Sequence, residues 1–496
     1  MEYVLGADIG SGSVKLTLLA QDGRIAATAG CEYPTYYPRV GWSEQDPEDW
    51  CRAFRTALAQ VLEESGADCG QITALAPDAA THTAVLLDRD RNVIRRAILW
   101  TDQRSTGEVN WLKEHCLDTI MAQTMNAPTT VWTLPQFMWL KKHEPEVWEK
   151  IDCILFAKDY LRYRLTGTIE TDHIDAMGSM FYDAGRQCWS DELCREFGID
   201  MGKLPDITEP FRIVGRLSAS SASAMGLNGG IPVVAGCGDQ AATSLGAGVA
   251  CEGECFDGAG TASVFSCCTS VYSPDIKHRT VLYPRHVIPG LFQPMAYISG
   301  GGLCLKWFRD TVLEGTKTYR ELEDEADMLQ PGCGGLIFIP HFCGRTCPND
   351  PDVKGMFWGL DYSHGSAAMF RAVMESIAYE YRMYLDILCG CGMKRPSTVF
   401  GTGGGSASPC FDRIKADVLG MDYSVTERKD TAPFGAALLA GYGTGIYPDL
   451  ASAAKRLTGI AGTYKADPGR HDLYKSRAEE YLHILEMSGM LRKRSR

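Results

Sequence analysis

The sequence of 496 residues has no long apolar run and no excess of positive charge. Its apolar stretches are far shorter than the roughly 20 residues that a membrane-spanning helix needs. Lysine and arginine number 49 against 62 aspartate and glutamate residues, so the net charge of −13 provides no basic surface for a nucleic acid backbone. We therefore expect neither a membrane nor a nucleic acid as a partner.

The first residues, MEYVLGAD, lack both the basic segment and the apolar core of a secretory leader. We therefore expect a cytoplasmic protein whose thiols are mostly reduced. The 19 cysteines include no Cys-x-x-Cys pair, and they are scattered through a long chain. This pattern favours neither a disulfide scaffold nor a structural zinc site.

Two common nucleotide-binding motifs are also absent. The chain has no G-x-x-x-x-G-K-[ST] loop, and Gly10-x-Gly12 lacks the third glycine of a dinucleotide fingerprint. Instead, Tyr3–Asp8, Lys15–Ala20 and Ile25–Ala29 each read as a strand, with glycine-containing turns between them. A glycine turn inside such a meander does not fit a nicotinamide-dependent dehydrogenase, in which the glycines lie between a strand and a helix.

What the chain does contain is enough apolar sequence, 45%, for two domains. Residues 255–265 (CFDGAGTASVF) echo residues 8–14 (DIGSGSV): each has an acid, then glycines and a hydroxyl, then a β-forming residue. The echo suggests one nucleotide-binding hairpin in each half of the chain. Two unrelated turns between strands would give the same echo, so the residues alone leave both interpretations open.

Three further segments have clear local signals. Asp46 followed by Pro47 predicts a helix start, with the helix running to about Glu64. The strand-like residues 231–235 end at Gly236-Cys237-Gly238-Asp239, and an acid between a strand end and a helix is typical of a catalytic position. The glycine-rich loop 401–406 follows a short strand and precedes a helix that has Phe411, Ile414 and Val418 on one face.

Taken in order, these segments resemble the FGGY carbohydrate kinases, and most of all their xylulokinase-like branch. The resemblance is carried by residues 8–15 (DIGSGSVK), 41–50 (GWSEQDPEDW), 98–104 (ILWTDQR), 132–135 (WTLP), 238–240 (GDQ), 371–375 (RAVME) and 403–405 (GGG). It implies an α/β fold of two actin-like ATPase (ribonuclease H-like) domains, with ATP and sugar in the cleft between them. The N-terminal, sugar-binding domain would span residues 1–245, and the C-terminal, ATP-binding domain residues 246–496.

The resemblance also implies the reaction, an ATP-dependent phosphorylation of a sugar hydroxyl with Mg²⁺ as cofactor. Phosphoryl transfer needs a base near the nucleophile and cations on the phosphoryl oxygens. Asp239 matches the family's catalytic aspartate, and Asp8 together with Asp239 is assigned to Mg²⁺. The alternative for Asp239 is a turn residue that caps the following helix. The residues assigned to ATP are Ser11, Gly12, Ser13, Lys15, Gly260, Thr261, Gly302, Lys306, Gly404, Gly405 and Ser408.

For the sugar, the resemblance implies contacts from Thr81, His82, Trp100, Asp102, Asp239 and Gln240. Trp100 offers an apolar face, and Asp102 offers a carboxylate that accepts hydroxyl hydrogen bonds. His82 lies where xylulokinases carry the histidine of a Met-His-Gly triplet, although its neighbours here are Thr81 and Thr83. Lys15 has the alternative of pointing outward from its strand, and His82 that of a core histidine.

Three departures from the xylulokinase pattern widen the range of expected substrates. They are Gln240 in place of asparagine, Gln136 in place of lysine, and the lost Met-His-Gly triplet. A ketopentose such as D-xylulose is the first expectation, while ribulose, gluconate, tetritols and glycerol stay open. A non-sugar actin-like ATPase and a catalytically silent sugar sensor are the rival functions; the sugar-site residues disfavour the first, and Asp8 with Asp239 disfavours the second. The family's habit suggests a homodimer.

Overall fold

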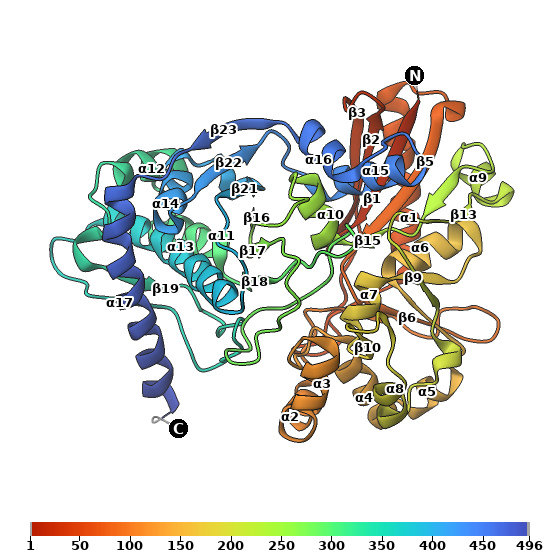
Figure 1. Ribbon diagram of the computed structural model, residues 1–496, viewed down its shortest axis with the longest axis horizontal. Helices are drawn as coiled ribbons and strands as arrows, with labels where there is room; N and C mark the ends of the chain where they lie inside the picture. The colour runs from red at the N-terminus through yellow and green to blue at the C-terminus, as the bar shows by residue number, and fades with distance from the viewer. Residues whose placement is uncertain (1, 494–496) are drawn as a thin grey trace. The chain divides into compact units, whose positions relative to one another are not determined.

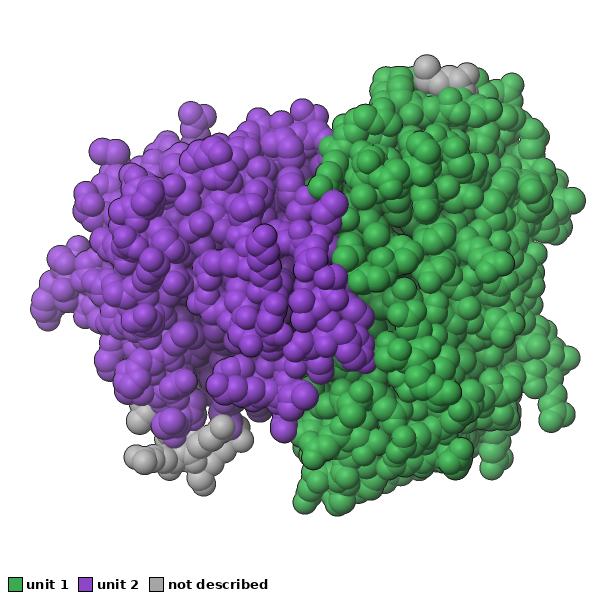
Figure 2. Space-filling model, viewed as in Figure 1, with its two compact units in different colours: residues 1–250, 284–291, 430–457 green, residues 251–283, 292–429, 458–496 purple. Residues whose placement is uncertain are grey.

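The computed structural model describes residues 2–493 and consists of two compact units. The first unit contains residues 1–250, 284–291 and 430–457, and the second contains residues 251–283, 292–429 and 458–496 (Figure 2). The boundary predicted at residue 245 divides the sequence into halves, whereas in the structure two later segments pack with the first unit. In the described part of the chain, no helix has both the length and the apolar character needed to cross a membrane.

The first unit is built on a mixed sheet with the strand order β13-β14-β5-β1-β2-β3, and β15 also pairs with β5 (Figure 1). The central strand β1 runs antiparallel to β2 and parallel to β5. The predicted meander is confirmed as β1, β2 and β3. The strands are β1 (Tyr3–Ile9), β2 (Ser13–Ala20), β3 (Ile25–Glu32), β5 (Ile72–Ala79), β13 (Ile213–Arg216), β14 (Pro232–Val234) and β15 (Cys237–Gly238).

The second unit repeats this arrangement in the order β18-β17-β16-β21-β22-β23. Its central strand β16 is antiparallel to β17 and parallel to β21, as β1 is to β2 and β5. The common topology supports a duplicated core and places the echoed turns at the same point of each sheet. The strands are β16 (Glu254–Ala259), β17 (Ser263–Cys267), β18 (Met295–Ile298), β21 (Thr398–Thr402), β22 (Asp422–Thr426) and β23 (Ile460–Tyr464).

Helices pack against both sheets. The predicted helix at residue 46 is confirmed as α1 (Pro47–Ser65), which Asp46 caps at its start and which ends at Gly66 in a left-handed conformation. The other main helices are α10 (Asp239–Gly246), α12 (Tyr319–Asp327), α13 (Ser366–Gly390), α14 (Pro409–Leu419), α15 (Thr431–Gly443), α16 (Leu450–Thr458) and α17 (Pro468–Lys493). On α14, Phe411, Ile414 and Val418 are all buried, as their spacing predicts.

Close backbone contacts hold α10 and α15 together and α15 on the first sheet. A Cβ at Gly435 of α15 would lie 2.0 Å from the Ala242 carbonyl oxygen of α10, and a Cβ at Gly246 would lie 2.0 Å from the Thr431 oxygen. At Gly6 of β1, a Cβ would lie 1.9 Å from the Pro433 oxygen. Only glycine fits such approaches. These three positions therefore fix where α10, and with it Asp239, lies on the sheet.

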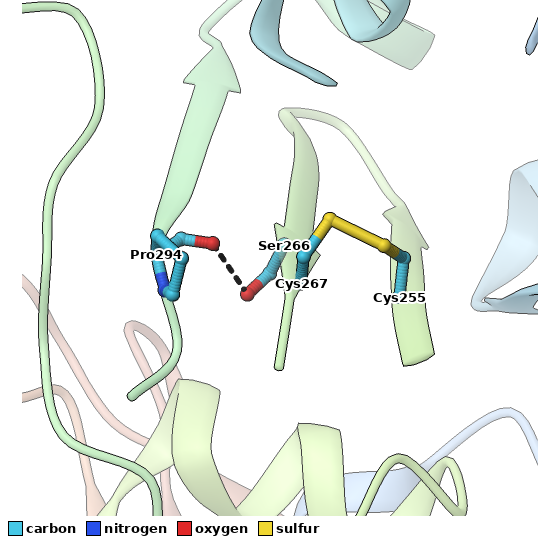
Figure 3. The surroundings of a disulfide bond; sticks show 4 residues. All are labelled: Cys255, Ser266, Cys267 and Pro294. Carbon is cyan, nitrogen blue, oxygen red and sulfur yellow. Dashed lines mark hydrogen bonds between the residues drawn. A yellow bond between two sulfur atoms is a disulfide. The ribbon is translucent and has the colours of Figure 1, made fainter. Parts of the chain in front are cut away.

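One disulfide crosses the β16–β17 hairpin of the second unit (Figure 3). Cys255 and Cys267 are directly opposite each other in the strand register, with Cα atoms 4.0 Å apart. Ser266, which points to the other face, donates a hydrogen bond to the Pro294 carbonyl oxygen at 3.1 Å. None of the other cysteines of the described chain forms a disulfide.

Candidate active site

Three carboxyl groups gather where the central strands of the first sheet end. The register pairs Asp8 of β1 with Asp78 of β5, and Asp78 with Cys237 of β15, which lies two residues before Asp239. Paired residues of neighbouring strands point to the same face of a sheet. Asp239 is the first residue of α10. Asp78 is fully buried, whereas Asp8 and Asp239 are only partly so.

The pKa values of these three groups are all raised. Burial, and then the negative charge of Asp239, raises the pKa of Asp8 to about 7. Burial raises the pKa of Asp239 to about 6, against the lowering effect of hydrogen bonds from Gln240 and Thr81. For Asp78, burial and then the charge of Asp8 raise the pKa well above its usual value. Asp8 and Asp78 lie within hydrogen-bond reach of each other, and among the described residues no other donor reaches Asp8 Oδ1 or either oxygen of Asp78.

The corresponding acid of the second sheet, Asp257, has the opposite surroundings. Its carboxylate forms an ion pair with Lys415 at 2.7 Å. It also accepts hydrogen bonds from the hydroxyls of Tyr381 at 2.7 Å and Tyr423 at 2.6 Å. Asp257 is therefore a satisfied core residue. Among the described residues, by contrast, no cation forms an ion pair with the Asp8, Asp78 and Asp239 cluster of the first sheet. Such a cluster attracts a divalent cation.

A bound Mg²⁺ therefore fits the first site better than the second. In the described part of the chain, no three His, Cys, Asp or Glu side chains are arranged to enclose a metal ion. This is compatible with Mg²⁺, which usually takes one or two carboxylates and completes its shell with water and phosphate oxygens. Asp8 and Asp239, which reach the surface of the cluster, are the residues that would hold it.

The hairpin turn after Asp8 exposes Ser11 and Gly12 at its tip. Gly10 N–H donates to the Ser13 carbonyl at 3.0 Å, and the Gln45 side chain donates to the Ser11 carbonyl at 2.8 Å, so the turn is fixed from both sides. The charge of Lys15 lowers the pKa of Asp8, and its ammonium lies 2.5 Å from Asp430 Oδ1. An exposed turn of this kind can present N–H and hydroxyl donors to an anion.

The turn after β5 carries two of the predicted sugar-site residues. Thr81 hydrogen-bonds to Asp239, and a Cβ at Gly238 would lie 2.2 Å from Thr81 Oγ1, so these residues are adjacent. His82 follows with a φ of 55° and with its ring centroid 5.0 Å from that of Trp132. Gln240 N–H donates to Asp239 Oδ1 at 2.8 Å and orients that carboxylate. The structure thus brings Thr81, Asp239 and Gln240 together, with His82 next to them.

The other two predicted sugar residues, Trp100 and Asp102, have different surroundings. Trp100 lies beside a small cavity that Gly10, Ser11 and Thr83 also line. Asp102 is buried, and its carboxylate accepts four hydrogen bonds from the Ser43 N–H and from the backbone and side chain of Arg104, at 2.6 to 2.9 Å. These four bonds fill its acceptor sites. A sugar contact at Asp102 would require the Arg104 pair to open.

In the second unit, all seven predicted ATP residues line one cavity of about 950 Å³. The helix α11 (Gly301–Trp307) closes one side of it, because Gly302 N–H donates to the Gly260 carbonyl at 3.2 Å and Leu303 N–H to the Thr261 carbonyl at 3.1 Å. Lys306 is exposed and forms an ion pair with Asp310. The seven residues are Gly260, Thr261, Gly302, Lys306, Gly404, Gly405 and Ser408.

Several residues of these two sites were missed from the sequence. Tyr319, Glu323 and Phe411 also line the large cavity, and burial raises the pKa of Glu323, partly offset by its hydrogen bond from Ser408. Nothing local in the sequence marks Tyr319 or Glu323. The sequence does mark Asp78 as an acid at the end of an apolar stretch. Only the parallel pairing of β1 and β5, however, places it beside Asp8.

Comparison with known proteins finds matches over nearly the whole chain. The FGGY family of carbohydrate kinases matches with its N-terminal domain at residues 3–246 and its C-terminal domain at residues 258–444. A xylulose kinase of Bacillus subtilis is 30% identical over 485 residues, covering 98% of this chain and 97% of that protein. An L-xylulose/3-keto-L-gulonate kinase of Escherichia coli is 28% identical over 98% of this chain and 97% of its own length. The crystal structure of xylulose kinase from Rhodospirillum rubrum superposes with a TM-score of 0.93 at 25% identity, covering 99% of this chain and 100% of that one.

Proposed function

Because the chain belongs to the FGGY family of carbohydrate kinases, we propose that it transfers the terminal phosphoryl group of ATP to a hydroxyl of a ketopentose, D-xylulose first. The protein is an ATP-dependent carbohydrate kinase. What we propose is which sugar it phosphorylates and which residues carry out the reaction. Similarity to a xylulose kinase over 98% of the chain supports the choice of sugar. The single observation that carries the mechanism is the group formed by Asp239, Thr81 and Asp8 at the end of the first sheet.

In this proposal Asp239 is the general base. It accepts the proton of the attacking sugar hydroxyl as the bond to phosphorus forms, and Gln240 and Thr81 hold its carboxylate in place. Thr81, His82 and Trp100 bind and orient the sugar. With its carboxylate bound to Arg104 and to the Ser43 N–H, Asp102 supports the neighbouring loop. It would contact the sugar directly if the pair with Arg104 opened.

Each of the two echoed turns offers donors that suit a phosphate group. Ser11, Gly12 and Ser13 offer backbone and hydroxyl donors, and Lys15 adds a positive charge. In the second unit, Gly260, Thr261, Gly302 and Lys306 line the large cavity and would contact the phosphates. Gly404, Gly405 and Ser408 line the same cavity and would contact the adenosine. Mg²⁺ held by Asp8 and Asp239 would neutralise charge on the phosphoryl oxygens.

The cavity of the second unit gives a direct test of ATP binding. Gly302→Ala places a methyl group where a Cβ would lie 2.4 Å from the Gly260 carbonyl oxygen, so the turn at residues 260–261 must move. We expect the Kd for ATP to rise by about tenfold, the loss expected when one or two hydrogen bonds to a charged ligand are disturbed. Titration calorimetry with a non-hydrolysable ATP analogue measures this change.

Gly365→Ala is the matched control, because Gly365 is exposed and a Cβ there meets nothing within 4 Å. It should leave the Kd for ATP unchanged. An unchanged Kd in Gly302→Ala as well would remove the 260–261 turn from the nucleotide site.

The sugar itself is tested with a substrate panel. A relative of similar length and identity is named an L-xylulose/3-keto-L-gulonate kinase, so neighbouring substrates must be compared directly. We expect ADP release, coupled to an indicator reaction, to be fastest with D-xylulose among D- and L-ketopentoses, gluconate, tetritols and glycerol. A higher kcat/KM for another sugar would identify that sugar as the substrate instead of D-xylulose. If no compound of the panel stimulated ADP release, the proposal would be contradicted.

A further inference from the structure

The turn that carries His82 has a backbone conformation that must be held in place. With a φ of 55°, His82 is one of the few non-glycine residues of the described chain in the left-handed region. For a non-glycine residue this conformation is costly and persists only when surrounding groups fix it. Two side chains do so: the His82 N–H donates to Asp175 Oδ1 at 2.6 Å, and Thr133 Oγ1 donates to the His82 carbonyl at 2.8 Å.

Asp175 is itself anchored by a buried lysine. Its other oxygen, Oδ2, lies 2.7 Å from Nζ of Lys158, and Lys158 also pairs with Asp159 at 2.6 Å and with Asp172 at 2.7 Å. All four side chains are buried. Burial alone would lower the pKa of Lys158, but the three carboxylates outweigh it and raise the pKa, so the ammonium stays charged. Asp175 is therefore held rigidly between Lys158 and the His82 backbone.

The same helix leaves room for the imidazole ring. Asp175 and Gly178 both belong to α7 (His173–Gly178), and a Cβ at Gly178 would lie 2.6 Å from His82 Nδ1. The ring thus lies directly against α7, with Trp132 on another side. Burial lowers the pKa of His82 to about 3, so the ring is neutral. Neither ring nitrogen has a hydrogen-bond partner among the described residues, and a neutral imidazole has one donor and one acceptor to offer.

We propose that Asp175 is a positioning residue for the sugar: anchored by Lys158, its carboxylate fixes the left-handed turn that directs the His82 ring and Thr81 toward the substrate. This inference rests on the proposed function, because it assigns the His82 imidazole to contact with a sugar hydroxyl. The proposal gives Asp175 a role that Asp159 and Asp172 do not share. Those two carboxylates pair with Lys158, but neither forms the hydrogen bond to the His82 turn. The buried group of Lys158, Asp159, Asp172 and Asp175 thereby affects sugar binding as well as the stability of the fold.

Asp175→Asn and Asp172→Asn form a matched pair of variants. Each removes one carboxylate from Lys158, but it is Asp175 that accepts from His82 N–H. In Asp175→Asn the new amide cannot satisfy both neighbours, since turning its oxygen to His82 N–H directs its NH₂ at the lysine ammonium. Asp172 caps α7 by accepting from Ile174 N–H at 2.7 Å, and asparagine caps equally well.

We expect Asp175→Asn to raise the KM for the sugar by about tenfold or more, as for a lost hydrogen bond to a charged group, with the KM for ATP unchanged. Asp172→Asn should change both KM values by less than about threefold, because it leaves the turn intact. Thr133→Val, which removes the other bond to His82, should act on the sugar KM in the same direction as Asp175→Asn. Equal effects of Asp175→Asn and Asp172→Asn, or parallel changes in the two KM values, would overturn the proposal.

A second measurement needs no substrate and separates this inference from the proposed function. In protein labelled with ¹³C in the histidine rings, His82→Gln identifies the His82 signal. Asp175→Asn should shift that signal and Asp172→Asn should not. A shift confined to Asp175→Asn, combined with no sugar phosphorylation by the unmodified enzyme, would contradict the proposed function alone. An unmoved signal in Asp175→Asn would overturn the positioning role even if the sugar is phosphorylated.

Discussion

Asp239→Asn is expected to lower kcat by about 10³-fold, within the range that a general base contributes. Asparagine keeps the shape of the side chain and the hydrogen bond from Gln240 N–H, which reaches Asp239 Oδ1 at 2.8 Å, but it cannot take up the proton of the sugar hydroxyl. The Kd for an ATP analogue should stay unchanged, because Asp239 is not among the residues assigned to ATP. Steady-state kinetics with saturating sugar measures kcat, and calorimetry measures the Kd for the ATP analogue.

Asp118→Asn is the matched control for this substitution. Asp118 is an exposed acid in the first turn of α3 (Leu117–Thr124), as Asp239 is an acid in the first turn of α10. The control should retain full activity. A loss of activity in Asp239→Asn that is matched by an equal loss of ATP affinity or of thermal stability would make Asp239 a structural residue.

Gly435→Ala is expected to lower the free energy of unfolding by about 3 kcal/mol, at the upper end of the usual range for overpacking. The added methyl would lie 2.0 Å from the Ala242 carbonyl oxygen and 3.0 Å from Gly246 N, and backbone atoms of a packed helix cannot move aside cheaply. Since α10 must shift, Asp239 at its start should move as well. We therefore expect a lower urea midpoint, followed by circular dichroism, together with reduced activity of the folded enzyme at low urea.

Gly107→Ala tests whether any glycine-to-alanine change in a helix would do the same. Gly107 lies in α2 (Thr106–His115), is exposed, and a Cβ at this position would meet nothing within 4 Å. It should leave the urea midpoint unchanged or raise it slightly, because alanine is the better helix former by up to about 1 kcal/mol. Equal midpoints for the two variants would mean that the α10–α15 contact is not tightly packed.

Local signals explain why much of the fold was predictable. Asp46 with Pro47 starts α1, the glycine turns divide β1, β2 and β3, and the apolar face of α14 repeats at helical spacing. These features depend only on neighbouring residues. The two halves were related through one short echo and through the family resemblance, and the matching strand orders of the two sheets agree with it.

The pairing of individual acids could not be assigned in this way. Asp102 has the carboxylate that a sugar ligand needs, yet the side chain of Arg104 and the distant Ser43 N–H occupy it. Asp257 echoes Asp8 in the sequence, but Lys415, which lies far along the chain on α14, neutralises it. Asp175 is 93 residues from His82, and only the fold brings its oxygen to that N–H group.

The sequence by itself indicated the family and the duplicated glycine turns, because motifs are written in the order of residues. Only the tertiary structure decided which acids are left without a cation and which are paired. The charge state of a carboxylate, and whether it is available to bind a ligand, depend on burial and on the groups within a few ångströms. In this protein those groups come from strands and helices far apart in the chain.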